Sequence, residues 1–183
     1  FSRNVLELKH DEMLMNIYSG LPEPIDYPMQ LAIEDRYRKV LVEVPLVLRN
    51  KKKVKARLMF DSGSMSELRL YAPFVEKHHL YDSSRTYTPI SEGGSTGDVS
   101  INLVDTLGAL IIGSSRINAP QAVLCKPSVH NDPAIDGLIG NLVWKRYNVL
   151  IDLKNRRLHL KSIEAGGAKV SELKIKRSVL QGR

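Results

Sequence analysis

The chain has 183 residues, of which 43% are hydrophobic and 26% are charged, and its formal net charge is +7 at pH 7. This length suits one folded domain, and this composition excludes general disorder. No apolar run approaches the roughly 18 residues of a membrane span, so we expect no transmembrane segment in this sequence.

The positive charge is the feature that could indicate an acidic partner such as nucleic acid. The basic residues gather at 51–53, at 156–157 and in the tail from 169 to 183. The first two groups are typical of solvated turns, and no interleaved aromatic residues or recognised nucleic-acid motif accompany them. We therefore expect no nucleic-acid partner.

The single cysteine, Cys125, cannot form an internal disulfide and has no partners for a metal cluster, so we interpret it as a small core residue. The sequence begins at Phe1 rather than Met, so an upstream signal or anchor could be missing from it. Localisation stays unknown, with the cell envelope and secretion both open.

Residues 1–37 are interpreted as an N-terminal extension. The apolar residues of 1–19 have a loosely helical spacing, and three prolines between Leu21 and Pro28 favour an extended connector. The extension could pack on the core, pair with a second subunit or lie near a substrate groove, and its sequence favours none of these roles over the others.

From residue 38 the pattern changes to strand. Residues 40–48 alternate, and a polar turn at 50–53 joins them to a second alternating run, 54–60, which predicts a long hairpin. This second strand ends on Asp61, followed by Ser62, Gly63 and Ser64. Burying a carboxylate is costly unless donors satisfy it, and this turn supplies hydroxyls and a glycine that permits a sharp bend. The alternative is an ordinary Asx or Ser turn, in which the same residues are common.

The segment after the turn predicts a short helix from about Ala72, because Pro73 interrupts the helical spacing that begins earlier. His78 and His79 follow on its surface. We interpret them as solvated side chains rather than metal ligands, since no third ligand lies nearby in the sequence.

Residues 87–99 predict a hairpin with a flexible tip that contains Gly93, Gly94 and Gly97. A phosphate-binding loop is the alternative interpretation. It is disfavoured because no Lys-Ser/Thr follows the glycines and the context is not a strand followed by a helix.

The second half of the chain contains short apolar runs at 99–112 and 122–125, as expected of an all-β, barrel-like domain. Leu138 and Ile139 then predict a strand, Gly140 allows close passage, and a short helix follows over 141–147. A final hairpin is expected over 149–160. Asp136 is interpreted as a turn residue without a chemical role.

Two motifs in this order, Asp61-Ser62-Gly63-Ser64 early and Leu138-Ile139-Gly140 before a short helix late, resemble the retropepsin-like, single-lobed aspartic proteases. The resemblance extends over roughly residues 40–161, most of the chain. It implies an all-β fold, a retropepsin-like acid protease barrel with short helices, over residues 38–162. The N-terminal extension, 1–37, and a basic C-terminal tail, 163–183, would flank this domain.

The same resemblance implies an aspartic endopeptidase that needs neither a cofactor nor a metal. Asp61 would be catalytic, Ser62 would bond across a subunit interface, and Ser64 would orient the outer carboxylate oxygen. The glycine-tipped hairpin would close over an extended peptide or protein substrate as a flap. Such a site needs two facing carboxylates, and this chain has one Asp-Ser-Gly, so the second Asp61 would come from the other subunit of a homodimer.

The sequence departs from the viral members of this family in two places. The viral enzymes usually carry an Asp four residues after the catalytic one and an Arg after the late Gly, and these form an ion pair; here the positions hold Met65 and Asn141. The long N-terminal extension is the second departure, and together they indicate a cellular, bacterial-type relative.

The alternative function is a catalytically inactive domain of this fold that binds a peptide or a protein partner. The intact Asp-Ser-Gly-Ser favours the enzyme.

Overall fold

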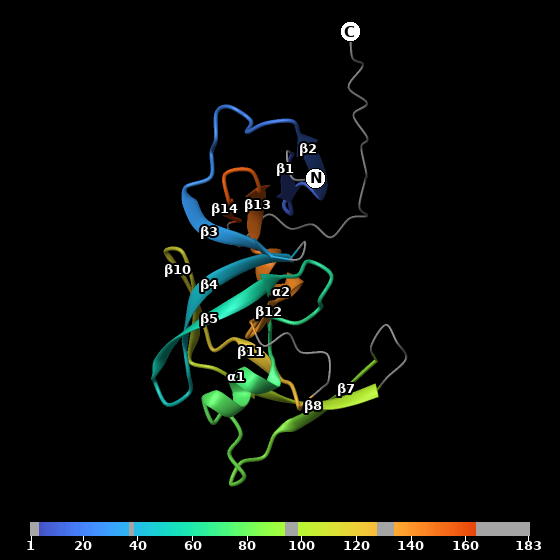
Figure 1. The fold of residues 1–183 in the computed structure, drawn as a ribbon, viewed down its shortest axis with the longest axis vertical. Coiled ribbons are helices and arrows are strands. Elements are labelled where there is room, and N and C mark those ends of the chain that lie inside the picture. The colour runs from blue at the N-terminus through green and yellow to red at the C-terminus, as the bar shows by residue number, and fades with distance from the viewer. Residues whose placement is uncertain (1–3, 37–38, 94–98, 128–133, 164–183) are drawn as a thin grey trace. The chain divides into compact units, whose positions relative to one another are not determined.

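A computed structural model describes residues 4–36, 39–93, 99–127 and 134–163 of the chain (Figure 1). Strands account for most of the regular structure in these ranges, and the helices there are α1 (Ala72–Lys77) and α2 (Asn141–Trp144). The predicted all-β class with short helices is therefore confirmed. Neither of these helices is long and apolar enough to cross a membrane.

The described residues form two compact units, one built from residues 4–33 together with 144–163 and the other from those between 34 and 143. Unit 1 contains an antiparallel sheet in the order β2-β1-β13-β14-β3. Its strands are β1 (Val5–Lys9), β2 (Leu14–Tyr18), β3 (Met29–Arg36), β13 (Tyr147–Asp152) and β14 (Arg157–Ser162). The predicted final hairpin is confirmed as β13 and β14.

The helical spacing expected in residues 1–19 is wrong, because this segment forms β1 and β2. Val5 and Glu7 of β1 are buried, and the register sets Leu6 opposite Ile151 and Leu8 opposite Val149 of β13. Pairing with an apolar strand distant in the sequence thus overrides a weak local periodicity. The predicted extension is folded over most of its length, while the predicted boundaries at 38–162 and 163–183 stay predictions.

Unit 2 contains the predicted hairpin of β4 (Lys39–Val47) and β5 (Lys53–Phe60), which pair without interruption from Leu41 opposite Met59 to Val47 opposite Lys53. The sheet continues in the order β4-β5-β12-β6-β11-β8-β7, with β9 paired to β4 and β10 to β9. The remaining strands are β6 (Leu68–Leu70), β7 (Thr88–Gly93), β8 (Val99–Thr106), β9 (Ala109–Ile112), β10 (Ser115–Asn118), β11 (Gln121–Leu124) and β12 (Gly137–Ile139).

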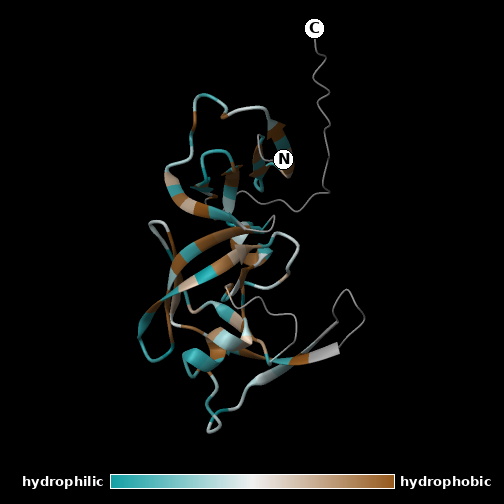
Figure 2. Cartoon of the chain, viewed as in Figure 1, coloured by the Kyte–Doolittle hydropathy of each residue, from teal (hydrophilic) through white to brown (hydrophobic). Residues whose placement is uncertain are grey.

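The core of unit 2 follows from the alternation along its strands, which Figure 2 shows as repeated hydrophobic and hydrophilic bands on β4 and β5. Ala56 and Leu58 of β5 are fully buried, as their places on the predicted apolar face require. The predicted short helix from Ala72 is confirmed as α1, which has a proline in its first turn and buries Phe74. Cys125 is buried, as predicted.

His159 is an unusual buried residue of unit 1. It lies on β14 opposite Leu150 and Gln30 and is 4% exposed. Neither ring nitrogen has a hydrogen-bond partner in the described part of the chain. Burial lowers the pKa of His159, and the positive charge of Arg157 acts in the same direction against the raising effect of Asp152. The imidazole is therefore held neutral inside the sheet.

A histidine whose pKa is lowered by folding stabilises the fold at pH values above its unfolded pKa of about 6.5, and this contribution is lost as the pH falls below that value. As the pH falls, we expect the free energy of unfolding of His159→Leu to decrease less steeply than that of the wild type. The two slopes should differ by at most about 1.4 kcal/mol per pH unit. Urea unfolding of both proteins at several pH values between 7.5 and 5 measures the difference.

His159→Gln is the matched control, because it also lacks a titrating group but leaves a polar side chain buried. It should share the flatter pH dependence of His159→Leu while being less stable than that variant at every pH. Parallel pH profiles for the wild type and both variants would show that His159 does not titrate with unfolding.

Candidate active site

Asp61 lies directly after β5, at the start of the turn predicted from the sequence. Its Oδ1 accepts hydrogen bonds from the backbone N–H of Gly63, at 2.9 Å, and of Ser64, at 3.2 Å. Its own N–H donates to the carbonyl of Ile139, at 3.1 Å. Asp61 is half-buried and the turn residues Ser62 and Gly63 are exposed, and the backbone of the turn orients the acid.

The late motif lies beside this turn. β12 pairs in parallel with β5, setting Leu138 opposite Met59 and Ile139 opposite Phe60, and pairs antiparallel with β6 on its other side. α2 begins directly after Gly140, and the N–H of Asn141 donates to the carbonyl of Ser64, at 2.7 Å. The two motifs, which lie far apart in the sequence, are therefore brought together by a strand pair and a loop contact.

Gly140 leaves no room for a side chain between the two motifs. Its N–H donates to the carbonyl of Glu67, at 3.0 Å. A Cβ atom built on Gly140 would lie 2.1 Å from the carbonyl oxygen of Ser66 and 2.9 Å from that of Ser64. Both atoms belong to the backbone, so they cannot move aside as a side chain would, and only glycine fits here.

The serines of the turn have different surroundings. Ser64 contacts Asp61 through its backbone N–H, and its hydroxyl lies 2.9 Å from the hydroxyl of Ser66. Ser62 is exposed, and Met65, at the position of the viral acid, is 75% exposed. The roles expected for Ser62 across an interface and for the Ser64 hydroxyl stay predictions.

The predicted flap corresponds to the hairpin of β7 and β8, in which Gly93 lies opposite Val99. The hairpin itself is therefore present, with strands of six and eight residues. Gly94 and Gly97 lie outside the described residues.

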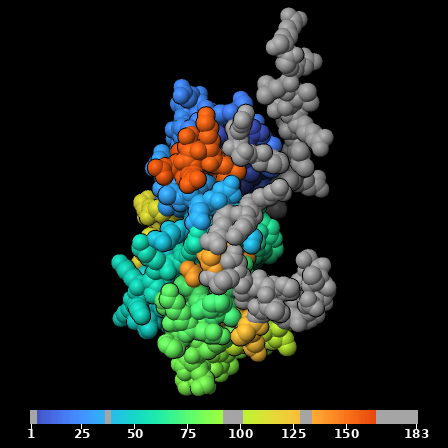
Figure 3. Space-filling view, viewed as in Figure 1, coloured from blue at the N-terminus to red at the C-terminus, as the bar shows by residue number. Residues whose placement is uncertain are grey.

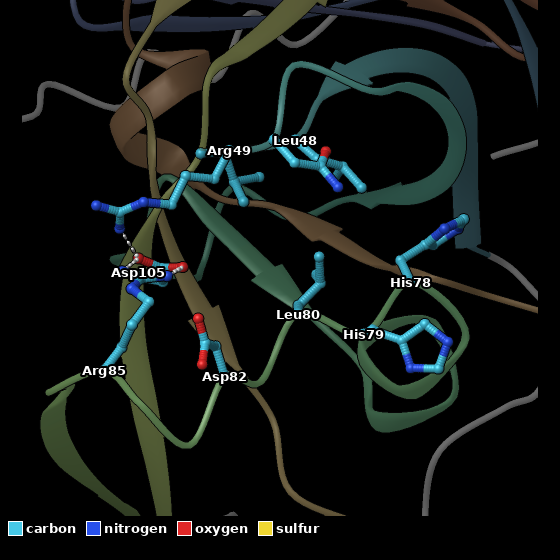
Figure 4. A pocket seen from close by; sticks show the side chains of 10 residues that line it. Leu48, Arg49, His78, His79, Leu80, Asp82, Arg85 and Asp105 are labelled. Carbon is cyan, nitrogen blue, oxygen red and sulfur yellow. Dashed lines mark hydrogen bonds and ion pairs between the residues drawn. The ribbon is translucent and has the colours of Figure 1, made fainter.

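A cluster that the sequence analysis missed holds the base of this hairpin. The buried carboxylate of Asp105, on β8, lies between two guanidinium groups (Figure 4). Arg85, just before β7, donates to its two oxygens at 2.9 and 2.7 Å, and Arg49 donates at 3.0 Å. Burial raises the pKa of Asp105, but hydrogen bonds from Arg85 and the Thr106 N–H, together with both positive charges, outweigh burial and lower it.

The Asp105 cluster borders a cavity of about 350 Å³, which is also lined by His78, His79 and Asp82. α1 and the loop after it, green in Figure 3, lie at the surface of unit 2. The cavity is lined by none of Asp61, Ser62, Gly63 and Ser64. This cavity is therefore not the place where Asp61 would act. The candidate site is identified by the geometry of the Asp61 carboxylate instead.

The structure also places the residues for which the sequence suggested no chemistry. Asp136 bridges backbone segments, because its Oδ2 accepts the Arg57 N–H at 2.8 Å and its carbonyl accepts the Tyr71 N–H at 2.9 Å. The ring of His78 packs on Phe74, with ring centroids 4.4 Å apart, and burial lowers its pKa. Across the described ranges, no three His, Cys, Asp or Glu side chains converge in a way that could hold a metal ion.

Comparison with known proteins identifies the fold. No protein-family model matches the chain, and no curated protein sequence matches it. Among solved structures, a retropepsin-like aspartic protease from Rickettsia conorii is similar, with 19% sequence identity and a TM-score of 0.51. The likeness covers 72% of this chain and 88% of that one. The predicted fold, a retropepsin-like acid protease barrel with short helices, is therefore confirmed, and the comparison shows the fold alone.

We expect Gly140→Ala to lower the free energy of unfolding by about 3 kcal/mol or more, because its Cβ would drive the Ser64–Ser66 backbone away from the late motif. Chemical denaturation measures the change. Gly20→Ala is the matched control, since a Cβ at Gly20 meets no atom within 4 Å, and it should change stability by no more than about 0.5 kcal/mol. Equal effects of the two substitutions would contradict the close approach at Gly140.

We expect Asp105→Asn to lower the free energy of unfolding at pH 7 by about 2 kcal/mol, because two guanidinium groups lose their shared counterion. The folded pKa is lowered, so the contribution of Asp105 is present above the unfolded pKa of about 3.9 and is lost as the pH falls below it. Urea unfolding at pH 7 and pH 3 measures both effects.

Two further substitutions test whether the contacts themselves carry this stability. Arg85, 24% exposed, makes two bonds to Asp105, whereas Arg49, 58% exposed, makes one. Arg85→Gln should therefore destabilise the protein more than Arg49→Gln does. The reverse order would contradict the assignment of Arg85 as the main partner.

Proposed function

We propose that this chain is an aspartic endopeptidase that hydrolyses peptide bonds with a water activated by two Asp61 carboxylates, one from each subunit of a homodimer. The observation that supports this most directly is the Asp61 turn. It combines a half-buried acid, two backbone N–H donors that fix the orientation of its carboxylate, and a late glycine packed against the same turn. The fold shared with a retropepsin-like protease is consistent with the proposal.

The chemistry needs two carboxylates that share one proton. Two carboxylates facing each other across a water cannot both ionise readily, so one stays protonated while the other accepts a proton from the attacking water. The water oxygen attacks the carbonyl carbon of the scissile bond, and the protonated carboxyl donates to the carbonyl oxygen. Transfer of a proton to the amide nitrogen then lets the C–N bond break.

The need for two subunits follows from the sequence. Asp61-Ser62-Gly63 is the chain's one Asp-Ser-Gly, and Asp82-Ser83-Ser84 lacks the glycine. A two-fold symmetric homodimer supplies the second Asp61, because both subunits have the same sequence. In this arrangement Ser62, exposed in the single chain, would contact the partner's turn.

The substrate class is an extended peptide or protein segment. The hairpin of β7 and β8 has the position in the chain of the flap in the family that the sequence resembles, between the two motifs. Such a hairpin would exclude water and offer backbone hydrogen bonds to a peptide that binds as an added strand. The cluster of Asp105, Arg85 and Arg49 would keep the base of this hairpin fixed.

We expect Asp61→Asn to abolish peptide cleavage while the fold and the dimer persist, because Asn keeps the shape of the side chain and removes the base. The melting temperature near neutral pH should stay level or rise, since any repulsion between the two carboxylates is relieved. Cleavage by the wild type should favour acidic pH, where the pair retains one proton. A peptide-library digest read by mass spectrometry, with light scattering on the same samples, measures activity and assembly.

Asp82→Asn is a matched control, because Asp82, like Asp61, accepts a hydrogen bond from the backbone N–H two residues on, here that of Ser84 at 3.0 Å, in an exposed turn outside the proposed site. It should cleave as the wild type does. Undiminished cleavage by Asp61→Asn would contradict the catalytic assignment. A wild type that cleaves nothing from acidic to neutral pH yet dimerises and binds extended peptides would identify the non-catalytic binding domain instead.

A further inference from the structure

β2 is an edge strand of the unit 1 sheet. In the part of the chain that the structure describes, it pairs with β1 alone. Every second residue of such a strand directs its N–H and C=O away from its neighbour, where they can bind another strand. Its sequence, Leu14-Met15-Asn16-Ile17-Tyr18, contains no charged residue or proline, which are the residues that usually protect an edge from pairing. The outer side of β2 can therefore accept one more strand.

One apolar face of this sheet is covered at β13 and uncovered at β2. Val149 and Ile151 of β13 are 0% and 5% exposed, or fully and almost fully buried, and lie opposite the two leucines of β1. The same leucines lie opposite Met15 and Ile17 of β2, which are 51% and 47% exposed. Figure 2 shows β2 largely in the hydrophobic colour. The apolar face thus continues to the edge of the sheet, where nothing in the described ranges covers it.

The other face holds β2 in a fixed register. The buried carboxylate of Glu7 accepts hydrogen bonds from Asn16 at 2.8 Å, Tyr18 at 2.7 Å and Tyr27 at 2.7 Å. Burial raises the pKa of Glu7, but these three bonds outweigh it and lower the pKa, so the network contains an ionised acid. The edge is thus ordered before any segment binds to it, which reduces the entropy lost on docking.

The segment that contains β2 is acidic, although the chain as a whole is basic. Residues 4–28 include five acidic residues and one basic residue, whereas the net charge of the chain is +7. Two of these acids, Glu12 and Asp26, take part in ion pairs. Asp11 and Glu12, in the turn before β2, are exposed. A segment that binds this edge is therefore expected to be basic and to alternate between apolar and polar residues.

The chain has such a segment at its C-terminus. Residues 169–183, which lie outside the described ranges, include five basic residues and one acid. Among them Leu173 and Ile175 alternate with Lys174 and Lys176, which is the period of a strand with one apolar face and one basic face.

β14 leads to this segment from the correct end of the sheet. Ser162, the last residue of β14, lies opposite Tyr147, and the Tyr147 carbonyl oxygen lies 2.6 Å from Nδ1 of His10. β2 begins at Leu14, at the same end. A strand added outside β2 is four strand spacings from β14, or about 19 Å. Residues 163–171 can span about 30 Å, so the connection is long enough.

We propose that residues 172–176 dock on β2 of the same chain as an added strand of the unit 1 sheet. The strand runs parallel to β2, because the chain leaves β14 at the end where β2 begins. Leu173 lies beside Met15, and Ile175 lies beside Ile17, so the apolar face is covered at its edge. The two lysines then face the side of the sheet on which Glu7 lies.

Two features favour the C-terminal segment over a second copy or a separate peptide. A short, glycine-containing linker gives a tethered segment an effective concentration of roughly millimolar, well above that of a protein in dilute solution. The charges also attract, since a basic segment meets an acidic one. Two copies that paired through β2 would instead bring two acidic segments together.

Hydrogen exchange of the full chain, read by mass spectrometry, tests the added strand. We expect Leu173→Asp/Ile175→Asp to exchange the amides of residues 14–18 about 10-fold faster than the wild type, because the outward N–H groups lose their partners. Val179→Asp/Leu180→Asp is the matched control, since it adds the same charge to the tail outside the paired residues. It should exchange these amides as the wild type does. Equal rates in the wild type and Leu173→Asp/Ile175→Asp would overturn the proposal.

Disulfide trapping in dilute solution identifies the occupant of the edge. Ile17→Cys/Ile175→Cys should form a disulfide within one chain under mild oxidation, because adjacent strands bring these positions within bonding distance. Ile17→Cys/Lys174→Cys is the control, since its second cysteine points to the opposite face and should stay reduced. The native Cys125 is buried and does not compete. Cross-links found only between two chains, or none in the first variant, would overturn the proposal.

Discussion

The contact on which the candidate site depends is the approach of Gly140 to the backbone of Ser64 and Ser66. No side chain fits between them, since even a methyl group would overlap a carbonyl oxygen. This contact and the bond from the Asp61 N–H to Ile139 hold the two motifs in one place. The orientation of the Asp61 carboxylate then follows, because its donors are backbone groups of the turn that Gly140 packs against.

A second constraint acts at the base of the β7–β8 hairpin. Asp105 holds this base, because the four hydrogen bonds that it accepts come from two arginines and a backbone N–H. The Asp105 side chain is buried and the Arg49 side chain is exposed. The negative charge of the carboxylate is therefore neutralised where water is scarce.

The N-terminal residues are a part of the unit 1 sheet. The ion pair that the viral enzymes form near the site cannot exist between Met65 and Asn141. The N-terminal residues instead build β1 and β2, whose inner face holds the ionised Glu7 in a network of three donors and whose outer edge is uncharged.

The sequence by itself determined the all-β class, the β4–β5 hairpin, the short helix at Ala72 and the strand-glycine-helix of the late motif, because each depends on local alternation or on turn residues. It also determined the Asp61 turn, whose serines and glycine are adjacent to the acid. Only the tertiary structure decided that residues 5–9 and 14–18 form strands, because β1 pairs with β13, more than a hundred residues away, and β2 pairs with β1. The same reason applies to Asp105, Arg85 and Arg49, and to the closeness of Gly140 and Ser66: no local pattern links residues that meet only when distant strands pair.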